Sequence, residues 1–226
     1  PAEAIPSGRQ SLPQLWQVLK HDHAFRRFIL TRQLFGLSGL ATPFYMTYAL
    51  TQLELPAQVA GRYTSISVLG SILAAVWMGW INERHGSKRV ILVSIGLASS
   101  VPLLALAVPW ALASSETALA WSYGLVFFAM SATMSSMMPG WMNLVLEHAP
   151  EPERPKYVGL TNTLNGVTTL FSTLGGLILA WTNDNYVFLF VLTLVGLSLS
   201  WPLALRLRDP RHAPPIPTGI VQEPGL

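Results

Sequence analysis

The 226-residue chain has no cysteine and few charged residues. Without cysteine it forms no disulfide and offers no thiolate ligand to a metal ion. Charged residues make up 11% of the chain, whereas a soluble domain typically carries about 25%. So few charges do not cover a surface that faces water, whereas a surface that faces lipid needs none. The composition therefore excludes an ordinary soluble domain.

Apolar residues make up 51% of the chain and gather in long runs. An apolar helix needs about 20 residues to cross roughly 30 Å of hydrocarbon. By this measure the sequence predicts an all-α membrane protein with six transmembrane helices. The predicted spans are residues 28–50, 58–81, 89–110, 119–146, 157–181 and 185–206.

The basic residues fall almost entirely on one side of these spans. Of the 14 Lys and Arg residues, only Arg62 falls on the opposite side. Short loops rich in Lys and Arg stay in the cytoplasm, so both termini are expected there. The net charge of +3 does not indicate nucleic-acid binding, because the basic residues occupy loops between apolar spans and not one polar face.

The chain divides into three parts. Residues 1–27 form a lead in which 12–27 have the spacing of an amphipathic helix on the inner membrane face, although a solvated linker is the alternative. Residues 28–209 form the bundle. Residues 210–226 hold five prolines and few apolar residues, so a disordered cytoplasmic tail is expected.

The two halves of the bundle resemble each other faintly. The sequence VAGRYT opens the second span and YVGLTN opens the fifth, while Pro43 and Pro139 interrupt the first and fourth. Three spans repeated once must have inverted topology, because three is odd. Inverted repeats are a recurring plan of secondary transporters.

The loop between the second and third spans carries the strongest motif, GWINERHGSKR, from Gly79 to Arg89. Gly79 suits a close helix approach, and Gly86 permits the tight turn that a short loop demands. A generic positive-inside loop explains Arg84, Lys88 and Arg89. It explains neither the two glycines nor Glu83.

This loop resembles the signature G-x-x-x-(D/E)-R-x-G-x-(K/R)-(K/R) of the major facilitator superfamily. Residues 143–159 resemble the loop between helices ten and eleven of such transporters, and 25–28 the entry to the seventh helix. The fourth span lacks the buried arginine that many N-terminal halves carry. The resemblance covers roughly residues 20–211. It implies the C-terminal half of the transporter fold, helices seven to twelve, built from two inverted three-helix repeats.

The resemblance also implies a function. It points to secondary active transport of a small solute by alternating access in the plasma (inner) membrane, with an N-terminal six-helix half as partner and no cofactor, metal or enzymatic activity. The signature loop would belong to an inner gate, where Glu83, Arg84 and Arg89 form a charge cluster with Glu147. The expected gating residues are Gly79, Glu83, Arg84, Gly86, Lys88, Arg89 and Glu147.

Polar residues inside the spans are candidates for contact with the solute, since the family's first and fourth spans of each half face the cavity. They are Gln33, Tyr45, Tyr48, Ser131, Thr133, Ser135, Asn143, Asn162 and Asn165. The alternative for each is a purely structural hydrogen bond. Arg32 is expected to snorkel to the inner interface, with binding of an anionic solute as the alternative.

Three other functions are alternatives for a chain of six spans. The sequence Gly36-Leu37-Ser38-Gly39 matches a motif of intramembrane proteases, but every histidine lies at or beyond a span end, too far for a catalytic base. A channel would need a filter-like loop, which the sequence does not show. A non-transporting membrane receptor or scaffold, derived from a transporter, is the remaining alternative.

Overall fold

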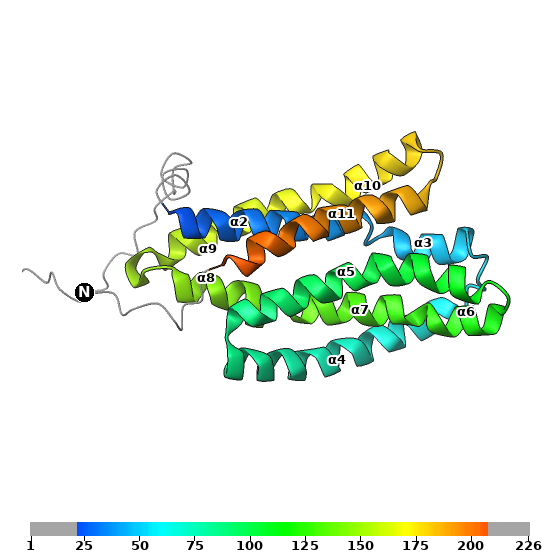
Figure 1. The fold of residues 1–226 in the computed structure, drawn as a ribbon, viewed down its shortest axis with the longest axis horizontal. Coiled ribbons are helices and arrows are strands. Elements are labelled where there is room, and N and C mark those ends of the chain that lie inside the picture. Colours follow the sequence, from blue (N-terminus) through cyan, green and yellow to red (C-terminus); the bar gives the residue numbers. More distant parts are fainter. Residues whose placement is uncertain (1–21, 208–226) are drawn as a thin grey trace, which may run out of the picture.

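A computed structural model of the chain describes residues 22–207, and these form a bundle of helices. The helices run roughly along one long axis (Figure 1). Most of the predicted lead and all of the predicted tail, residues 1–21 and 208–226, lie outside the described residues.

The first half of the bundle begins earlier than the sequence predicts. Its first helix starts at His23 rather than at Phe28, because Asp22 caps it by accepting a hydrogen bond from the backbone N–H of Phe25 at 2.8 Å. The elements are α2 (His23–Gly36), η1 (Leu37–Leu40), α3 (Phe44–Thr51), α4 (Val59–His85) and α5 (Ser87–Leu112). Pro43 lies at the break before α3.

The second half is interrupted in a similar way. Its elements are α6 (Glu116–Ser122), α7 (Gly124–Ser135), η2 (Met137–Met142), α8 (Asn143–His148), η3 (Glu151–Glu153), α9 (Arg154–Thr168), α10 (Leu170–Trp181) and α11 (Tyr186–Leu205). The η2 turn is π-helical and contains Pro139, which cannot donate a backbone hydrogen bond to the helix.

Five helical stretches within residues 22–207 are long and apolar enough to cross a bilayer. They are Val59–His85, Ser87–Leu112, Glu116–His148, Glu151–Trp181 and Tyr186–Leu205. The predicted span 28–50 is not among them, because the chain there is divided between α2, η1 and α3. The sequence located the apolar run and the interruption at Pro43, but it treated residues 28–50 as one span and did not place the break as early as Leu37.

The helices pair in a regular way. Helix α4 packs against α7. Helix α9 packs against α2, and α10 packs against η1. Helices α5 and α11 pack against each other. In addition, α5 packs against α7, and α11 packs against α2. All of these contacts join the first half of the bundle to the second.

A close approach of two helices depends on Gly70 of α4. A Cβ atom at Gly70 would lie 2.5 Å from Ser131 Oγ and 2.9 Å from the Phe128 carbonyl oxygen, both on α7. Gly79 has no such role within the described residues, because a Cβ added there meets nothing within 4 Å. The close helix approach at Gly79 therefore stays a prediction, because none of the described helices makes it.

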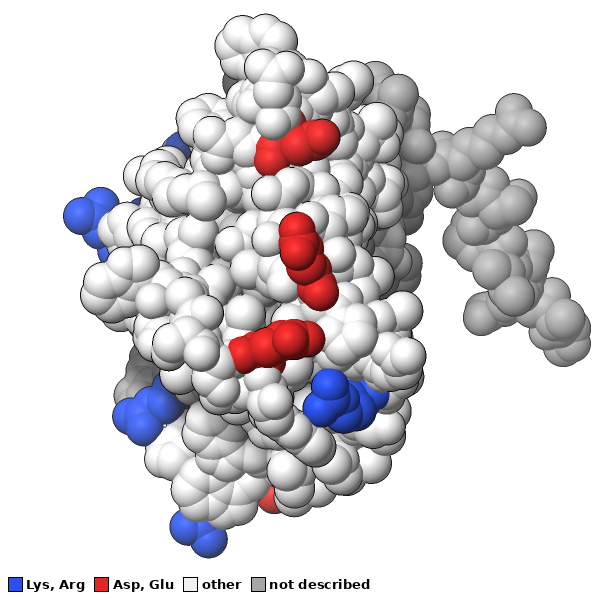
Figure 2. Space-filling model, turned by 90° about the vertical axis from the view of Figure 1, so that its right-hand side faces the viewer, with Lys and Arg blue, Asp and Glu red and all other residues white. Residues whose placement is uncertain are grey.

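The two ends of the bundle differ in charge. One end, which we call the basic end, holds the start of α2, the α4–α5 turn, the α8–α9 connection and the end of α11 (Figure 1). The opposite end holds exposed Glu54, Glu116 and Asp184, and Figure 2 shows acidic side chains in a row across it. The bundle is thus polarised along its axis.

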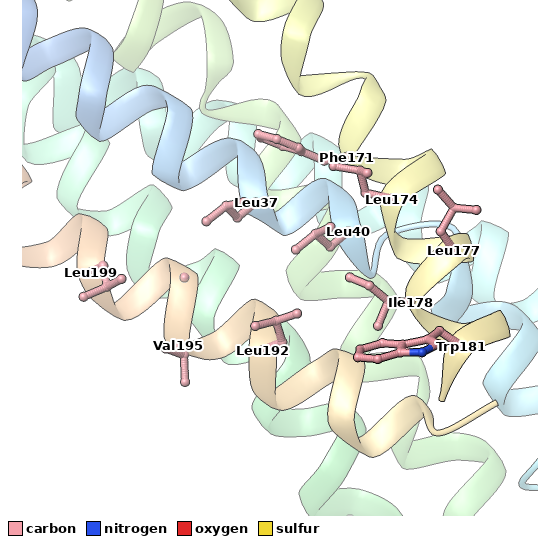
Figure 3. Close-up of a pocket in the computed structure, with 11 residues that line it drawn as sticks. Leu37, Leu40, Phe171, Leu174, Leu177, Ile178, Trp181, Leu192, Val195 and Leu199 are labelled. Atoms are coloured by element: carbon pink, nitrogen blue, oxygen red, sulfur yellow. The ribbon is translucent and has the colours of Figure 1, made fainter. Parts of the chain in front are cut away.

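Much of the bundle's side surface is apolar and exposed. On α4 the exposed side chains include Leu69, Leu73, Val76 and Trp77. A groove of about 620 Å³ runs between η1, α10 and α11, and Figure 3 shows its apolar lining, with Trp181 at one end. Such surfaces suit hydrocarbon and not water.

Candidate functional site

The α4–α5 turn is closed by Gly86 at the basic end. Its backbone angles are φ 82° and ψ 166°, a conformation that glycine adopts easily and other residues avoid. Its N–H donates to the carbonyl oxygen of Asn82 at 2.9 Å, and its own carbonyl accepts from Arg89 N–H at 3.2 Å. Gly86 therefore ends α4 and starts α5 within a single residue.

Glu147 of α8 contacts this turn through Ser87, a residue that was not among the predicted gating residues. The buried hydroxyl of Ser87 donates to Glu147 Oε1 at 2.9 Å and lies 3.1 Å from Asn82 Oδ1. Within residues 22–207 no ion pair joins Glu147 to Arg84 or Arg89. A neutral hydroxyl thus connects the fourth span to the signature loop.

The charged residues of the loop lie on the surface. Glu83, Arg84 and Arg89 are exposed, and Lys88 is half-buried. The guanidinium of Arg84 lies over the Trp80 ring, 4.8 Å from its centroid, on the same helix. These side chains are therefore accessible at the basic end of the bundle.

A second polar cluster at the basic end was not predicted. Asp22 Oδ2 lies 3.1 Å from His148 Nε2 and accepts a hydrogen bond from the Tyr157 hydroxyl at 3.1 Å. It joins the starts of α2 and α9 to the end of α8. Asp22 is an acceptable N-cap residue by sequence, but its partners are more than a hundred positions away, so no local pattern reveals them.

Four of the nine candidate solute contacts make structural hydrogen bonds. Gln33 Nε2 donates to the Leu164 carbonyl at 3.1 Å, joining α2 to α9. Ser131 and Thr133 donate to carbonyls of their own helix, at 2.9 and 2.8 Å. Ser135 donates to the Ser71 carbonyl of α4 at 3.0 Å. None of these bonds prevents contact with a solute, but each already has a structural role.

The two tyrosines belong to an aromatic cluster near the opposite end. Tyr45 is buried and stacks on Phe190 with ring centroids 4.8 Å apart. Tyr48 is half-buried and lies edge-on to the same phenylalanine at 5.2 Å. Tyr48 is therefore the more accessible of the two.

The three asparagines differ in exposure. Asn162 of α9 is exposed, whereas Asn143 and Asn165 are half-buried. Asn162 and the signature loop lie on separate spans, so the structure does not bring all the predicted residues into one site. Within residues 22–207 no cluster of three or more His, Asp or Glu side chains is placed to hold a metal ion.

Arg32 does not snorkel as expected. It retains only 8% of its surface exposed, because α2 turns this residue towards Trp141 of η2, a side chain that is wholly buried. Trp141 was not among the predicted residues.

The bundle is thus that of a polytopic helical membrane protein with a signature turn at its basic end. The sequence model of the Major Facilitator Superfamily matches residues 8–223. The chain belongs to this superfamily, whose members are transporters and not enzymes, and it is an integral membrane protein. No curated protein matches the chain.

Proposed function

We propose that the chain is the C-terminal six-helix half of a secondary active transporter, which moves a small solute by alternating access together with an N-terminal six-helix half. The observation that carries the proposal is the signature turn at Gly86, with Glu147 of the fourth span bound to Ser87 beside it. This contact fixes the turn that, by the family resemblance, belongs to the inner gate.

The helix pairings support two inverted three-helix repeats. Suppose that the first, second and third spans are exchanged with the fourth, fifth and sixth. The contact of α4 with α7, between the second and fourth spans, then becomes a contact between the fifth and first spans. That contact is present, because α9 packs against α2 and α10 packs against η1. The α5–α11 contact is exchanged with itself, and α5–α7 becomes α11–α2. A two-fold relation between the halves requires this set of pairings.

The broken first span is proposed as the sixth crossing. In Figure 1, α2 and α3 follow each other along the long axis, from the basic end towards the opposite end. Discontinuous helices are common where transporters bind solute. The break at residues 37–43 therefore suits a cavity-facing span better than a loop.

The basic end is proposed to lie in the cytoplasm. This orientation rests on the Lys and Arg residues at that end, because Lys and Arg set the orientation of membrane spans. The absence of native cysteine makes the test direct, because single-cysteine variants need no background removed. A membrane-impermeant thiol reagent should label Asn183→Cys in intact cells, and His85→Cys only after the membrane is opened. Labelling of both from outside would contradict this topology.

Solute counterflow in liposomes tests the transport function. The complete protein, with its N-terminal half, should exchange a labelled solute against the unlabelled solute at a rate that exceeds protein-free liposomes. A non-transporting receptor or scaffold, the alternative function, would bind a ligand without exchanging it. Binding without counterflow across a broad panel of solutes would favour that alternative.

A further inference from the structure

Two buried side chains meet at the junction of α2 and η2. The Cζ atom of Arg32 lies 5.4 Å from the centroid of the Trp141 ring, which is wholly buried. Arg32 Nε and Trp141 Nε1 are both buried, and neither has a hydrogen-bond partner within residues 22–207. The two unpartnered atoms thus belong to side chains in contact.

Both atoms are hydrogen-bond donors, and this limits what satisfies them. A guanidinium and an indole carry no acceptor, so neither group satisfies the other. Arg32 takes part in none of the ion pairs of the described residues, which leaves a buried positive charge without a counter-charge. A buried charge and a buried donor are both costly when unpaired. An anionic oxygen accepts hydrogen bonds from both groups and balances the charge of Arg32.

The surroundings indicate what kind of anion fits. Phe28 and Phe35 lie beside the Trp141 ring, with ring centroids 5.9 and 4.8 Å away. Arg32 follows Phe28 by four residues and precedes Phe35 by three, so all three share one face of α2. One guanidinium among aromatic rings suits a singly charged group on an apolar body. A phosphate dianion would need more positive charge.

The position of Trp141 supports a functional rather than a packing role. Trp141 lies in the π-helical turn η2, which interrupts the fourth span. Such turns occur frequently at functional sites. An ionisable residue within a span is likewise a marker of a solute or ion pathway.

We propose that Arg32 and Trp141 bind the carboxylate of an organic monocarboxylate, whose apolar part lies against the aromatic side chains. The guanidinium supplies the charge, and Arg32 Nε and the indole N–H donate to the carboxylate oxygens. The inference that such a monocarboxylate is the transported solute rests on the proposed function. The binding itself is measurable without transport.

The test uses the complete protein, with its N-terminal half, in lipid nanodiscs, with benzoate as the probe and benzamide as its uncharged counterpart. Thermal unfolding and titration calorimetry report binding. Benzoate should raise the unfolding midpoint and give a saturable isotherm, whereas benzamide should do neither. Equal binding of the two compounds, or no binding of benzoate, would overturn the proposal.

Substitutions then locate the site. Arg32→Gln should abolish the benzoate shift, and Arg32→Lys should weaken binding about tenfold because an ammonium lacks the planar set of donors. Trp141→Phe keeps an aromatic ring but removes the N–H, so it should also weaken binding about tenfold. Arg154→Gln, which removes an exposed guanidinium, is the matched control and should leave binding unchanged. Retention of wild-type affinity by all three site variants would refute the assignment.

The unfolding midpoint measured without ligand shows whether Arg32 is free to bind a ligand or forms an ion pair within the protein. Removal of an uncompensated buried charge should leave the midpoint of Arg32→Gln equal to or above that of wild type. A midpoint several degrees lower, together with no benzoate shift in the wild type, would show that a carboxylate elsewhere in the protein already holds Arg32. Counterflow of another solute without benzoate binding would refute the inference and leave the proposed function intact.

Discussion

Asp22 and His148 meet at the basic end of the bundle, with Oδ2 and Nε2 3.1 Å apart. The pKa of Asp22 reflects opposing influences. Burial is the largest and raises it, but hydrogen bonds with His148, the Phe25 N–H and the Tyr157 hydroxyl together lower it to about 2, from 3.8. The ionised carboxylate is therefore part of the native connection between α2, α8 and α9.

The first prediction concerns acid stability. Because the folded pKa of Asp22 lies below the unfolded value, its contribution is complete above pH 3.8 and is lost as the pH falls towards 2. Asp22→Asn should lower the free energy of unfolding by about 1 kcal/mol at neutral pH and flatten the decline below about pH 5. Thermal unfolding in detergent at several pH values measures both. Glu151→Gln, at an exposed carboxylate, is the control and should keep the wild-type pH profile.

The second prediction concerns the contact between Ser87 and Glu147. Ser87→Ala and Glu147→Gln should each lower stability by about 1 kcal/mol, since each weakens a partly buried hydrogen bond to a charged group. A double-mutant cycle should then show a coupling of similar size. Additive losses would mean that the contact between Ser87 and Glu147 contributes nothing to the free energy of unfolding. The fourth span and the signature loop would then touch without stabilising each other.

The third prediction concerns Glu83, whose role in the gate rests on the family resemblance. Glu83→Gln should reduce the initial rate of counterflow by the complete protein and leave the amount of folded protein in the membrane unchanged. A substitution of this size adds no bulk, so a lower rate reports the lost charge. An unaltered rate would remove Glu83 from the gating proposal.

The fourth prediction compares two glycines of α4. Gly70→Ala should destabilise the protein by about 1–3 kcal/mol, because the added methyl group meets the Phe128 carbonyl of α7 as well as the Ser131 hydroxyl. Gly79→Ala should be neutral or stabilise by up to about 1 kcal/mol, because the methyl group meets open space and alanine favours helix. Chemical unfolding of both variants decides the matter. Similar losses in the two would contradict the packing described for α4 and α7.

The fifth prediction separates structural from solute-binding residues on α2 and α9. Gln33→Leu should lower stability by about 1 kcal/mol, since its bond to the Leu164 carbonyl is lost. Asn162→Ala, at an exposed position, should leave stability unchanged and raise the solute KM in counterflow. Wild-type transport by the Asn162 variant would exclude that side chain from the cavity.

Local patterns in the sequence were sufficient for the parts of this fold that depend on local chemistry. Apolar runs gave the helical stretches because a bilayer accepts only helices with their backbone bonds satisfied. The signature spacing gave the turn at Gly86, since few residues other than glycine adopt its φ of 82°. Pro43 indicated an interruption of the first span, but the start of the break at Leu37 was less visible, because residues 34–41 are mostly apolar.

The sequence by itself determined that the chain is a helical membrane protein, which end of the bundle is basic, and which family its signature loop resembles. These follow from composition, span length and spacing along the chain. Only the tertiary structure decided that Glu147 meets Ser87, that Asp22 meets His148 and that Arg32 turns inward to Trp141. Each of these pairs joins residues 60 or more positions apart, so its geometry depends on how whole helices pack and not on any local pattern.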